Sequence, residues 1–170
     1  MFACAVGLSA VAHAGTITTT FNVTSGTFAP EFVWEPNAPV DPVIGSFTIT
    51  YDPTVSVTNQ LTGPGSININ VSSALVFSYD STFHELFIGG AVAGAAAIAV
   101  GTNDFGLEIN SPETAPSLFH LFYSQAGYPG LVWTTLSGNV SVSPEPASLV
   151  LFAGGSLLVA AIRRNRLKSN

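Results

Sequence analysis

The side chains best suited to chemistry in this 170-residue chain are its three histidines and ten acidic residues. His84-Glu85 begins like the helix of a zinc protease, but no second histidine follows at the fifth position, so a helix would not present two ligands on one face. His120 lies in an expected strand and points away from its apolar neighbours, Phe119 and Leu121, as a surface or half-buried histidine does. His13 lies in a segment that we expect to be removed. We predict no catalytic residue and no metal ligand among them.

The carboxylates are the remaining candidates. Two of them could pair for glycoside hydrolysis, or several could bind Ca²⁺ through loop oxygens, but no EF-hand spacing occurs. Most stand where turns are expected, and Asp and Asn side chains cap turns through local hydrogen bonds. Turn formation is therefore the expected role and no cofactor is expected, with Ca²⁺ binding as an alternative and catalysis as the weakest one. The candidates are Asp41, Asp52, Asp80, Asp104, Glu108 and Glu113.

Positive charge is confined to the end of the chain. Residues 1–162 contain no Lys or Arg, so the body offers no cationic clamp for a phosphate or an oxyanion, and no Gly-x-Ser-x-Gly nucleophile motif occurs. We expect no nucleic-acid partner, because phosphate backbones require cations. The only cysteine, Cys4, lies in the segment to be removed, which leaves the mature domain without a disulfide or a thiol. The basic residues are Arg163, Arg164, Arg166 and Lys168.

Aromatic side chains offer one further kind of site. Exposed rings could form a platform on which sugars stack, although aromatic residues of a β-sandwich usually belong to its core. The candidates are Trp34, Trp133, Tyr123 and Tyr128.

Strands must position these side chains, because residues 15–143 consist of short β-prone runs separated by Gly, Pro, Asn and Asp. In the run 45–51, Phe47, Ile49 and Tyr51 fall on one face, and this alternation places one face in a core. About eight to ten such strands predict an all-β domain, an antiparallel β-sandwich or jelly roll. The runs are 16–23, 45–51, 66–71, 74–79, 106–109, 118–123, 131–136 and 138–142.

The stretch 86–100 is apolar and rich in Ala and Gly. With about 15 residues it is shorter than the roughly 20 that a membrane-spanning helix needs. We expect two buried strands around a Gly-rich turn, and a buried helix is the alternative.

The N-terminal segment, residues 1–14, resembles a signal peptide. A short apolar stretch ends in Ala12-His13-Ala14, whose small first and third residues are typical of a cleavage site, so the mature chain would begin at Gly15. A positively charged n-region is missing, and we therefore expect the true start to lie upstream of Met1. An apolar strand or helix of the domain is the alternative.

The C-terminal segment contains Pro144-Glu145-Pro146, the uncharged apolar run Ala147–Ile162 and a basic tail, 163–170. As a helix the run would be roughly 24 Å long against a bilayer core of roughly 30 Å, a deficit that snorkelling arginines and local thinning can absorb. Basic residues beside a span stay cytoplasmic. We expect one C-terminal transmembrane α-helix, and an amphipathic helix packed on the domain is the alternative.

These three parts, in this order, resemble a PEP-CTERM protein-sorting signal over residues 144–170. The resemblance implies recognition by exosortase, a membrane cysteine protease or transpeptidase of Gram-negative bacteria. It also implies that the signal is removed as the protein passes to the outer surface, often in species that make exopolysaccharide. By the same resemblance, the recognition motif is Pro144, Glu145 and Pro146, and the stop-transfer cluster is Arg163, Arg164, Arg166 and Lys168.

The sequence thus predicts an exported, non-enzymatic protein of the cell surface or extracellular matrix. The precursor would be anchored in the inner membrane by a single pass, with exosortase and the export machinery as partners. One alternative is a β-sandwich module that binds polysaccharide, such as exopolysaccharide, with or without Ca²⁺. A secreted hydrolase is the weakest alternative, because no catalytic constellation is visible.

Overall fold

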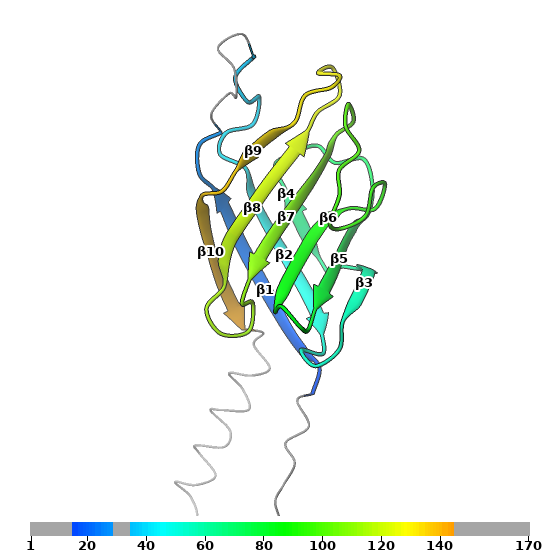
Figure 1. Ribbon diagram of the computed structural model, residues 1–170, viewed down its shortest axis with the longest axis vertical. Coiled ribbons are helices and arrows are strands. Elements are labelled where there is room, and N and C mark those ends of the chain that lie inside the picture. The colour runs from blue at the N-terminus through cyan, green and yellow to red at the C-terminus, as the bar shows by residue number, and fades with distance from the viewer. Residues whose placement is uncertain (1–14, 29–34, 145–170) are drawn as a thin grey trace, which may run out of the picture.

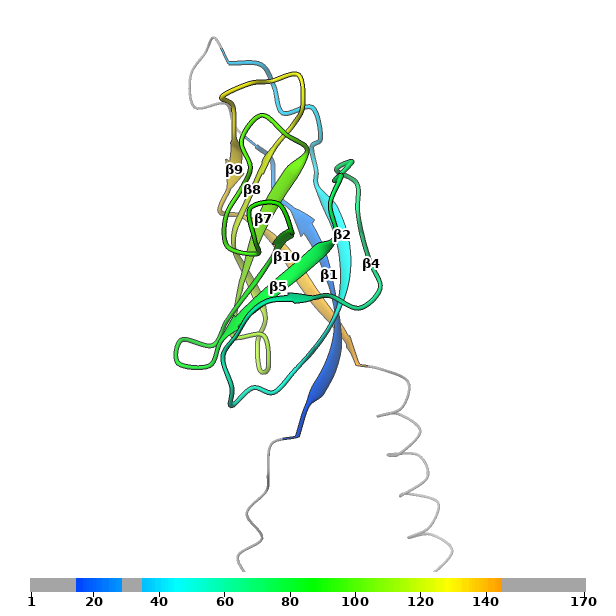
Figure 2. The ribbon, with the colours of Figure 1, turned by 90° about the vertical axis from the view of Figure 1, so that its right-hand side faces the viewer.

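The computed structural model describes residues 15–28 and 35–144, and all regular structure in this part of the chain is β-strand. The strands form two antiparallel sheets that face each other, as the ribbon views show (Figure 1, Figure 2). The predicted all-β sandwich is therefore confirmed. The strands are β1 (Ile17–Ser25), β2 (Ile44–Tyr51), β3 (Val57–Leu61), β4 (Gly65–Ile67), β5 (Leu75–Asp80), β6 (Glu85–Gly90), β7 (Asp104–Asn110), β8 (Ser117–Ser124), β9 (Trp133–Thr135) and β10 (Gly138–Pro144).

The two sheets differ in size and in how the chain builds them. The four-stranded sheet, called sheet A here, has the order β10-β1-β2-β4. The six-stranded sheet, sheet B, has the order β3-β5-β6-β7-β8-β9, in which β5 to β9 are neighbours in chain order. The chain crosses from sheet A to sheet B and back several times, so neither sheet comes from one continuous stretch.

Period-two alternation explains why these residues form a sandwich. In β1, Phe21 and Val23 are buried while Asn22 and Thr24 are exposed, and Phe21 pairs with Phe47 of β2. Inward-facing side chains of both sheets form one core, as the two inner faces of a sandwich do. The rings of Phe47 and Phe105 stack across the two sheets with their centroids 5.9 Å apart.

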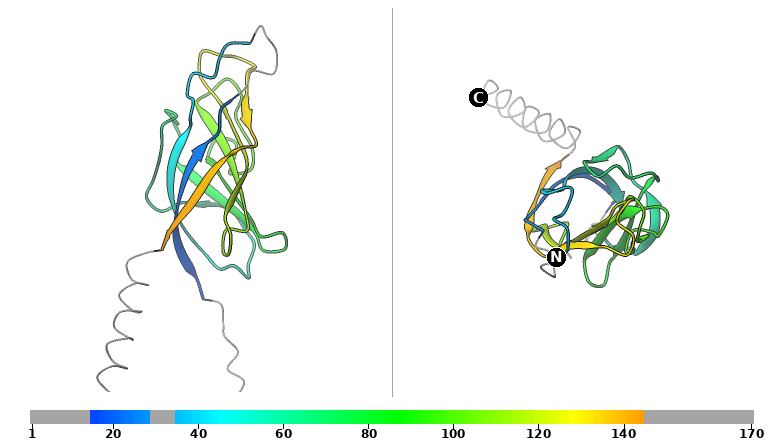
Figure 3. Two further views of the ribbon diagram at one scale, coloured as in Figure 1. Left: turned by 90° about the vertical axis from the view of Figure 1, so that its left-hand side faces the viewer. Right: turned by 90° about the horizontal axis from the view of Figure 1, so that it is seen from above.

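Both ends of the described chain leave the sandwich at the same end. Thr19 of β1 pairs with Pro144 of β10, so the start of one strand lies beside the end of the other (Figure 3). We call this the termini end, and it also carries the loops 52–56, 81–84 and 111–116. The opposite end, called the distal end, carries the long loops 91–103 and 125–132 (Figure 1).

The prediction for residues 86–100 was wrong in its second half. Residues 86–90 belong to β6, but 91–103 form an irregular loop instead of a second strand. Side chains from other elements accept hydrogen bonds from its backbone: Asp104 from Ala99 at 2.8 Å, and Ser124 from Gly101 at 2.8 Å. Because these groups satisfy the backbone N–H donors, the loop needs no strand partner.

Within residues 15–28 and 35–144, no helix is both long and apolar enough to cross a membrane. The predicted span Ala147–Ile162, the stop-transfer cluster and the segment ending at Ala14 lie outside the described residues.

Candidate functional site

Two of the candidate carboxylates form turns, as predicted. Asp52 Oδ1 accepts hydrogen bonds from the backbone N–H and the hydroxyl of Thr54, at 2.8 and 2.6 Å. Asp80 Oδ1 accepts from the backbone N–H of Thr82 at 2.8 Å and from that of Phe83 at 3.3 Å. Both carboxylates therefore stabilise loops at the termini end.

Asp41 and Asp104 likewise accept hydrogen bonds from backbone N–H groups of loops. Asp41 Oδ2 accepts from the backbone N–H of Phe28 at 3.2 Å. Asp104, which is only 1% exposed, accepts from Ala99 and from its own neighbour Phe105. Among the residues that the structure describes, no three His, Cys, Asp or Glu side chains gather closely enough to share a metal ion.

Three of the four candidate aromatic residues belong to the core, as aromatic residues of a β-sandwich usually do, and do not form a stacking platform. Tyr123 and Trp133 are buried at 0% and 5% exposure, with their rings stacked at 5.2 Å. Tyr128 is half-buried and packs edge-on against Trp133 at 5.1 Å. Tyr123 and Trp133 face the core because they alternate with outward-facing residues of β8 and β9, and Tyr128 joins them from the loop between these strands. Trp34 lies outside the described residues.

A cluster at the termini end was not foreseen from the sequence. The Tyr79 hydroxyl donates a hydrogen bond to Glu113 and lies 3.2 Å from His84 Nδ1 and 3.2 Å from the carbonyl oxygen of Pro53. His84 Nδ1 is 3.7 Å from the Glu113 carboxylate. One hydroxyl thus joins the three loops of this end. His84 is therefore a loop contact, and its φ of 56° fits the tight turn between β5 and β6.

Tyr51 lies beside this cluster, its ring 4.6 Å from that of Tyr79. Its hydroxyl is buried and has no hydrogen-bond partner among the described residues. Burial first, and then the negative charge of Glu113, raise the pKa of the Tyr51 phenol. Burial and the hydrogen bond to Glu113 likewise raise the pKa of Tyr79. Both phenols are therefore neutral over the physiological range of pH.

The outward face of sheet B carries two carboxylates and a histidine. Glu85 and Glu108 stand on adjacent strands, and burial and then the charge of Glu85 raise the pKa of Glu108. His120 pairs with Glu108 across β7 and β8, and burial lowers its pKa. The acids lie on an open sheet face. Two neighbouring carboxylates are the groups that glycoside hydrolysis uses.

The strand around His120 departs from simple alternation. The register shifts from Glu108↔His120 to Ile109↔Leu118, which leaves Phe119 as an extra residue of a bulge. Leu121 is buried as predicted, but Phe119 is 53% exposed. The expectation that both neighbours of His120 face the core was therefore wrong for Phe119.

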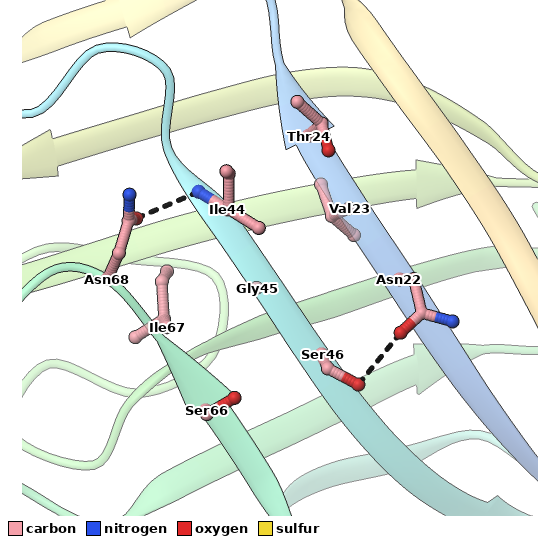
Figure 4. A pocket seen from close by; sticks show the side chains of 9 residues that line it. All are labelled: Asn22, Val23, Thr24, Ile44, Gly45, Ser46, Ser66, Ile67 and Asn68. Atoms are coloured by element: carbon pink, nitrogen blue, oxygen red, sulfur yellow. Dashed lines mark hydrogen bonds between the residues drawn. The ribbon is translucent and has the colours of Figure 1, made fainter.

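Residues of the described chain line a groove of about 510 Å³ on the outward face of sheet A, between β1, β2 and β4 (Figure 4). Gly45 leaves room on the inward side of the sheet for the core ring of Phe47, since a Cβ there would lie 2.6 Å from that ring. The groove is lined by Asn22, Val23, Thr24, Ile44, Gly45, Ser46, Ser66, Ile67 and Asn68.

Hydrogen bonds hold the polar side chains of this groove in place. The Ser46 hydroxyl donates to Asn22 Oδ1 at 2.9 Å across β1 and β2 (Figure 4). Asn68 Oδ1 accepts from the backbone N–H of Ile44 at 2.8 Å, and its Nδ2 donates to Pro42 at 3.0 Å. The groove is therefore built from ordered, uncharged donors and acceptors.

Hydrogen bonds between outward-facing side chains of β1 and β2 continue along the sheet towards the termini end. Thr20 and Thr48 share a hydrogen bond of 2.9 Å, and Thr18 and Thr50 share another of 2.9 Å. Together with Asn22–Ser46 they form three consecutive cross-strand pairs on one face. Such a face can bind a polar ligand through hydrogen bonds, but it has no group that titrates near neutral pH.

The predicted sorting residues are only partly within the described chain. Gly15 is exposed just before β1, and Pro144 is the last residue of β10. Ala14, Glu145, Pro146 and the basic cluster lie outside the described residues. Comparison with known proteins adds no relative: no family model, curated protein or solved structure matches this chain.

Proposed function

We propose that this chain is an exported, non-enzymatic protein of the cell surface or extracellular matrix, delivered by a C-terminal PEP-CTERM signal that exosortase processes. The signal would consist of the motif Pro144-Glu145-Pro146, a transmembrane helix over Ala147–Ile162 and the basic tail 163–170. The precursor would be anchored in the inner membrane of a Gram-negative bacterium, with the sandwich outside, before its transfer to the surface.

The observation that carries this proposal is the position of the two chain ends. Pro144 ends β10 and pairs with Thr19 near the start of β1. The sorting motif therefore begins where the chain leaves the sheet, and the proposed N-terminal cleavage point before Gly15 is at the same end. A domain with both processing points at one end can be tethered there while its distal loops and both sheet faces remain accessible.

The structure supports the two alternative functions, a hydrolase and a polysaccharide-binding module, to different degrees. A hydrolase could use Glu85 and Glu108, two half-buried carboxylates on adjacent strands of sheet B, but neither lines the groove of sheet A. A polysaccharide-binding module is favoured by the ordered polar groove of sheet A, and this role is compatible with surface delivery.

Intact-mass analysis of the protein from its native host, with and without exosortase activity, tests the proposal. We expect a mature chain that begins at Gly15 and, only when exosortase is active, ends near residues 144–146. Glu145→Ala should block the C-terminal cut, because it removes the only charged group of the motif.

Glu35→Ala is the matched control, because Glu35 also precedes a proline but lies outside the motif. This variant should be processed like the unaltered chain. A chain that keeps Arg163 in both backgrounds would contradict the sorting signal and leave a membrane-anchored domain.

A further inference from the structure

We infer that the outward face of sheet A is a binding surface for an uncharged polysaccharide, which lies along the hydroxyl and amide side chains of β1, β2 and β4. The surface belongs to the folded domain, so its binding can be measured separately from any sorting of the chain.

Charge is the first reason. The four strands of sheet A contain no Asp, Glu, Lys or Arg. Every acidic residue of the described chain lies in sheet B or in a loop: Glu35, Asp41, Asp52, Asp80, Glu85, Asp104, Glu108 and Glu113. Exposed sheet faces ordinarily carry charged side chains, which keep a protein soluble. A face without charge, on a domain that otherwise bears only negative charge, is complementary to a neutral ligand and repels anionic polymers.

Hydrogen-bonding capacity is the second reason. A hydroxyl has one donor and two acceptor sites, so in each Thr–Thr pair one donor and three acceptor sites remain for a ligand. Asn22 accepts from Ser46 through Oδ1, and its Nδ2 points away from that pair (Figure 4). The pairs Thr20–Thr48 and Thr18–Thr50 extend this arrangement along β1 and β2. Polysaccharides carry the same mixture of donors and acceptors without charge.

Pre-organisation strengthens this match. The cross-strand pairs fix the side-chain rotamers before a ligand arrives, which lowers the entropy cost of binding. Their spacing is also regular, because neighbouring strands lie about 4.8 Å apart and alternate residues of a strand about 6.7 Å apart. A repeating polymer can therefore use successive pairs in the same way.

Apolar contact is the third reason. Ile44 is 52% exposed at the edge of the groove and pairs with Thr24, next to the Asn22–Ser46 pair. The Ile44 side chain offers aliphatic surface beside the polar pairs, against which the C–H faces of sugar rings can pack. The groove thus combines a small apolar area with convergent polar groups, as ligand sites do.

The experiment is native affinity electrophoresis of the full chain in gels that contain a neutral polysaccharide (dextran, galactomannan or soluble β-glucan) or anionic alginate. A zwitterionic detergent keeps the apolar segment in solution without adding a sugar head group. We expect retardation by at least one neutral polymer, unchanged by EDTA, and none by alginate. The double variant N22A/S46A should weaken binding about tenfold or more, since each lost hydrogen bond contributes a few-fold to affinity.

The matched control is T58A/T134A, which removes two exposed hydroxyls from sheet B and should bind like the unaltered chain. Equal urea midpoints for both double variants would show that neither is unfolded. The inference is overturned if no neutral polymer retards the chain, if only alginate does, or if N22A/S46A binds as well as the control. It is also overturned if the chain sediments as a dimer that N22A/S46A dissociates, because the face would then join two copies.

Discussion

Replacing Tyr123 with phenylalanine removes a single oxygen atom that connects sheet B to the loop before β2. The Tyr123 hydroxyl donates to the carbonyl oxygen of Val40 and accepts from its backbone N–H, both at 3.0 Å. The ring itself is 0% exposed and packs edge-on against Phe28 at 5.2 Å and stacks on Trp133 at 5.2 Å. Tyr123→Phe keeps these ring contacts and loses only the two hydrogen bonds.

The expected cost follows from those two bonds. Each contributes about 0.5–1.5 kcal/mol net, and Val40 is only half-buried, so water replaces part of what is lost. We therefore expect the free energy of unfolding to fall by about 2 kcal/mol. For a domain of this size, about 4 °C per kcal/mol gives a fall in Tm of about 8 °C.

Urea unfolding followed by tryptophan fluorescence measures this change, because Trp133 packs directly on the altered ring. The matched control is Tyr128→Phe, whose hydroxyl makes no hydrogen bond within the described part of the chain. It should change stability by less than about 0.5 kcal/mol. A loss at Tyr123 no larger than that of the control would refute the reasoning.

Two further predictions use the same measurement. Tyr51→Phe should leave stability at neutral pH unchanged or raise it by up to about 1 kcal/mol, because it removes a buried hydroxyl that has no partner among the described residues. The folded chain raises the pKa of Tyr51, so the stability that depends on a neutral Tyr51 is fully present below the ordinary tyrosine pKa of about 10 and is lost as the pH rises further. Tyr51→Phe has no phenol to ionise, so the variant should lose less stability than the unaltered chain between about pH 9 and pH 11. An equal alkaline loss in both proteins would contradict this. Phe47→Ala should cost about 3–5 kcal/mol, because it empties the stacked contact with Phe105. Phe119→Ala, at the 53% exposed bulge, should cost less than about 1 kcal/mol, and similar losses at both positions would argue against this core.

The strands that could be predicted are those whose alternation is strong. In β2, Phe47, Ile49 and Tyr51 alternate with small polar residues, and the burial follows that pattern residue by residue. β3 was missed because only Val57 of its five residues is even partly buried, so the sequence there has no apolar face. Its position depends on pairing with β5, which no local pattern reveals.

The loop 91–103 and the groove of sheet A depend on contacts between distant parts of the chain. An Ala/Gly-rich run has the composition of a buried element, but Asn59, Asp104 and Ser124 satisfy its backbone from outside. The groove was missed for a similar reason. The outward residues of β1 and β2 follow from their alternation, whereas their pairing with each other and with β4 is a property of the assembled sheet.

The pairing of β10 with β1 also determines how the domain would bear a mechanical load. Tension applied to the chain beyond Pro144 runs along the axis of β10, while the hydrogen bonds to β1 lie across that axis. When the opposing force acts at the distal end, the residue pairs from Thr19↔Pro144 to Ser25↔Gly138 share the load in shear, and do not open one after another as in peeling. Detachment under force depends on the height of the unfolding barrier. An edge strand that ends at the attachment point thus acts as a clamp, which lets a domain tethered there resist being pulled from a surface.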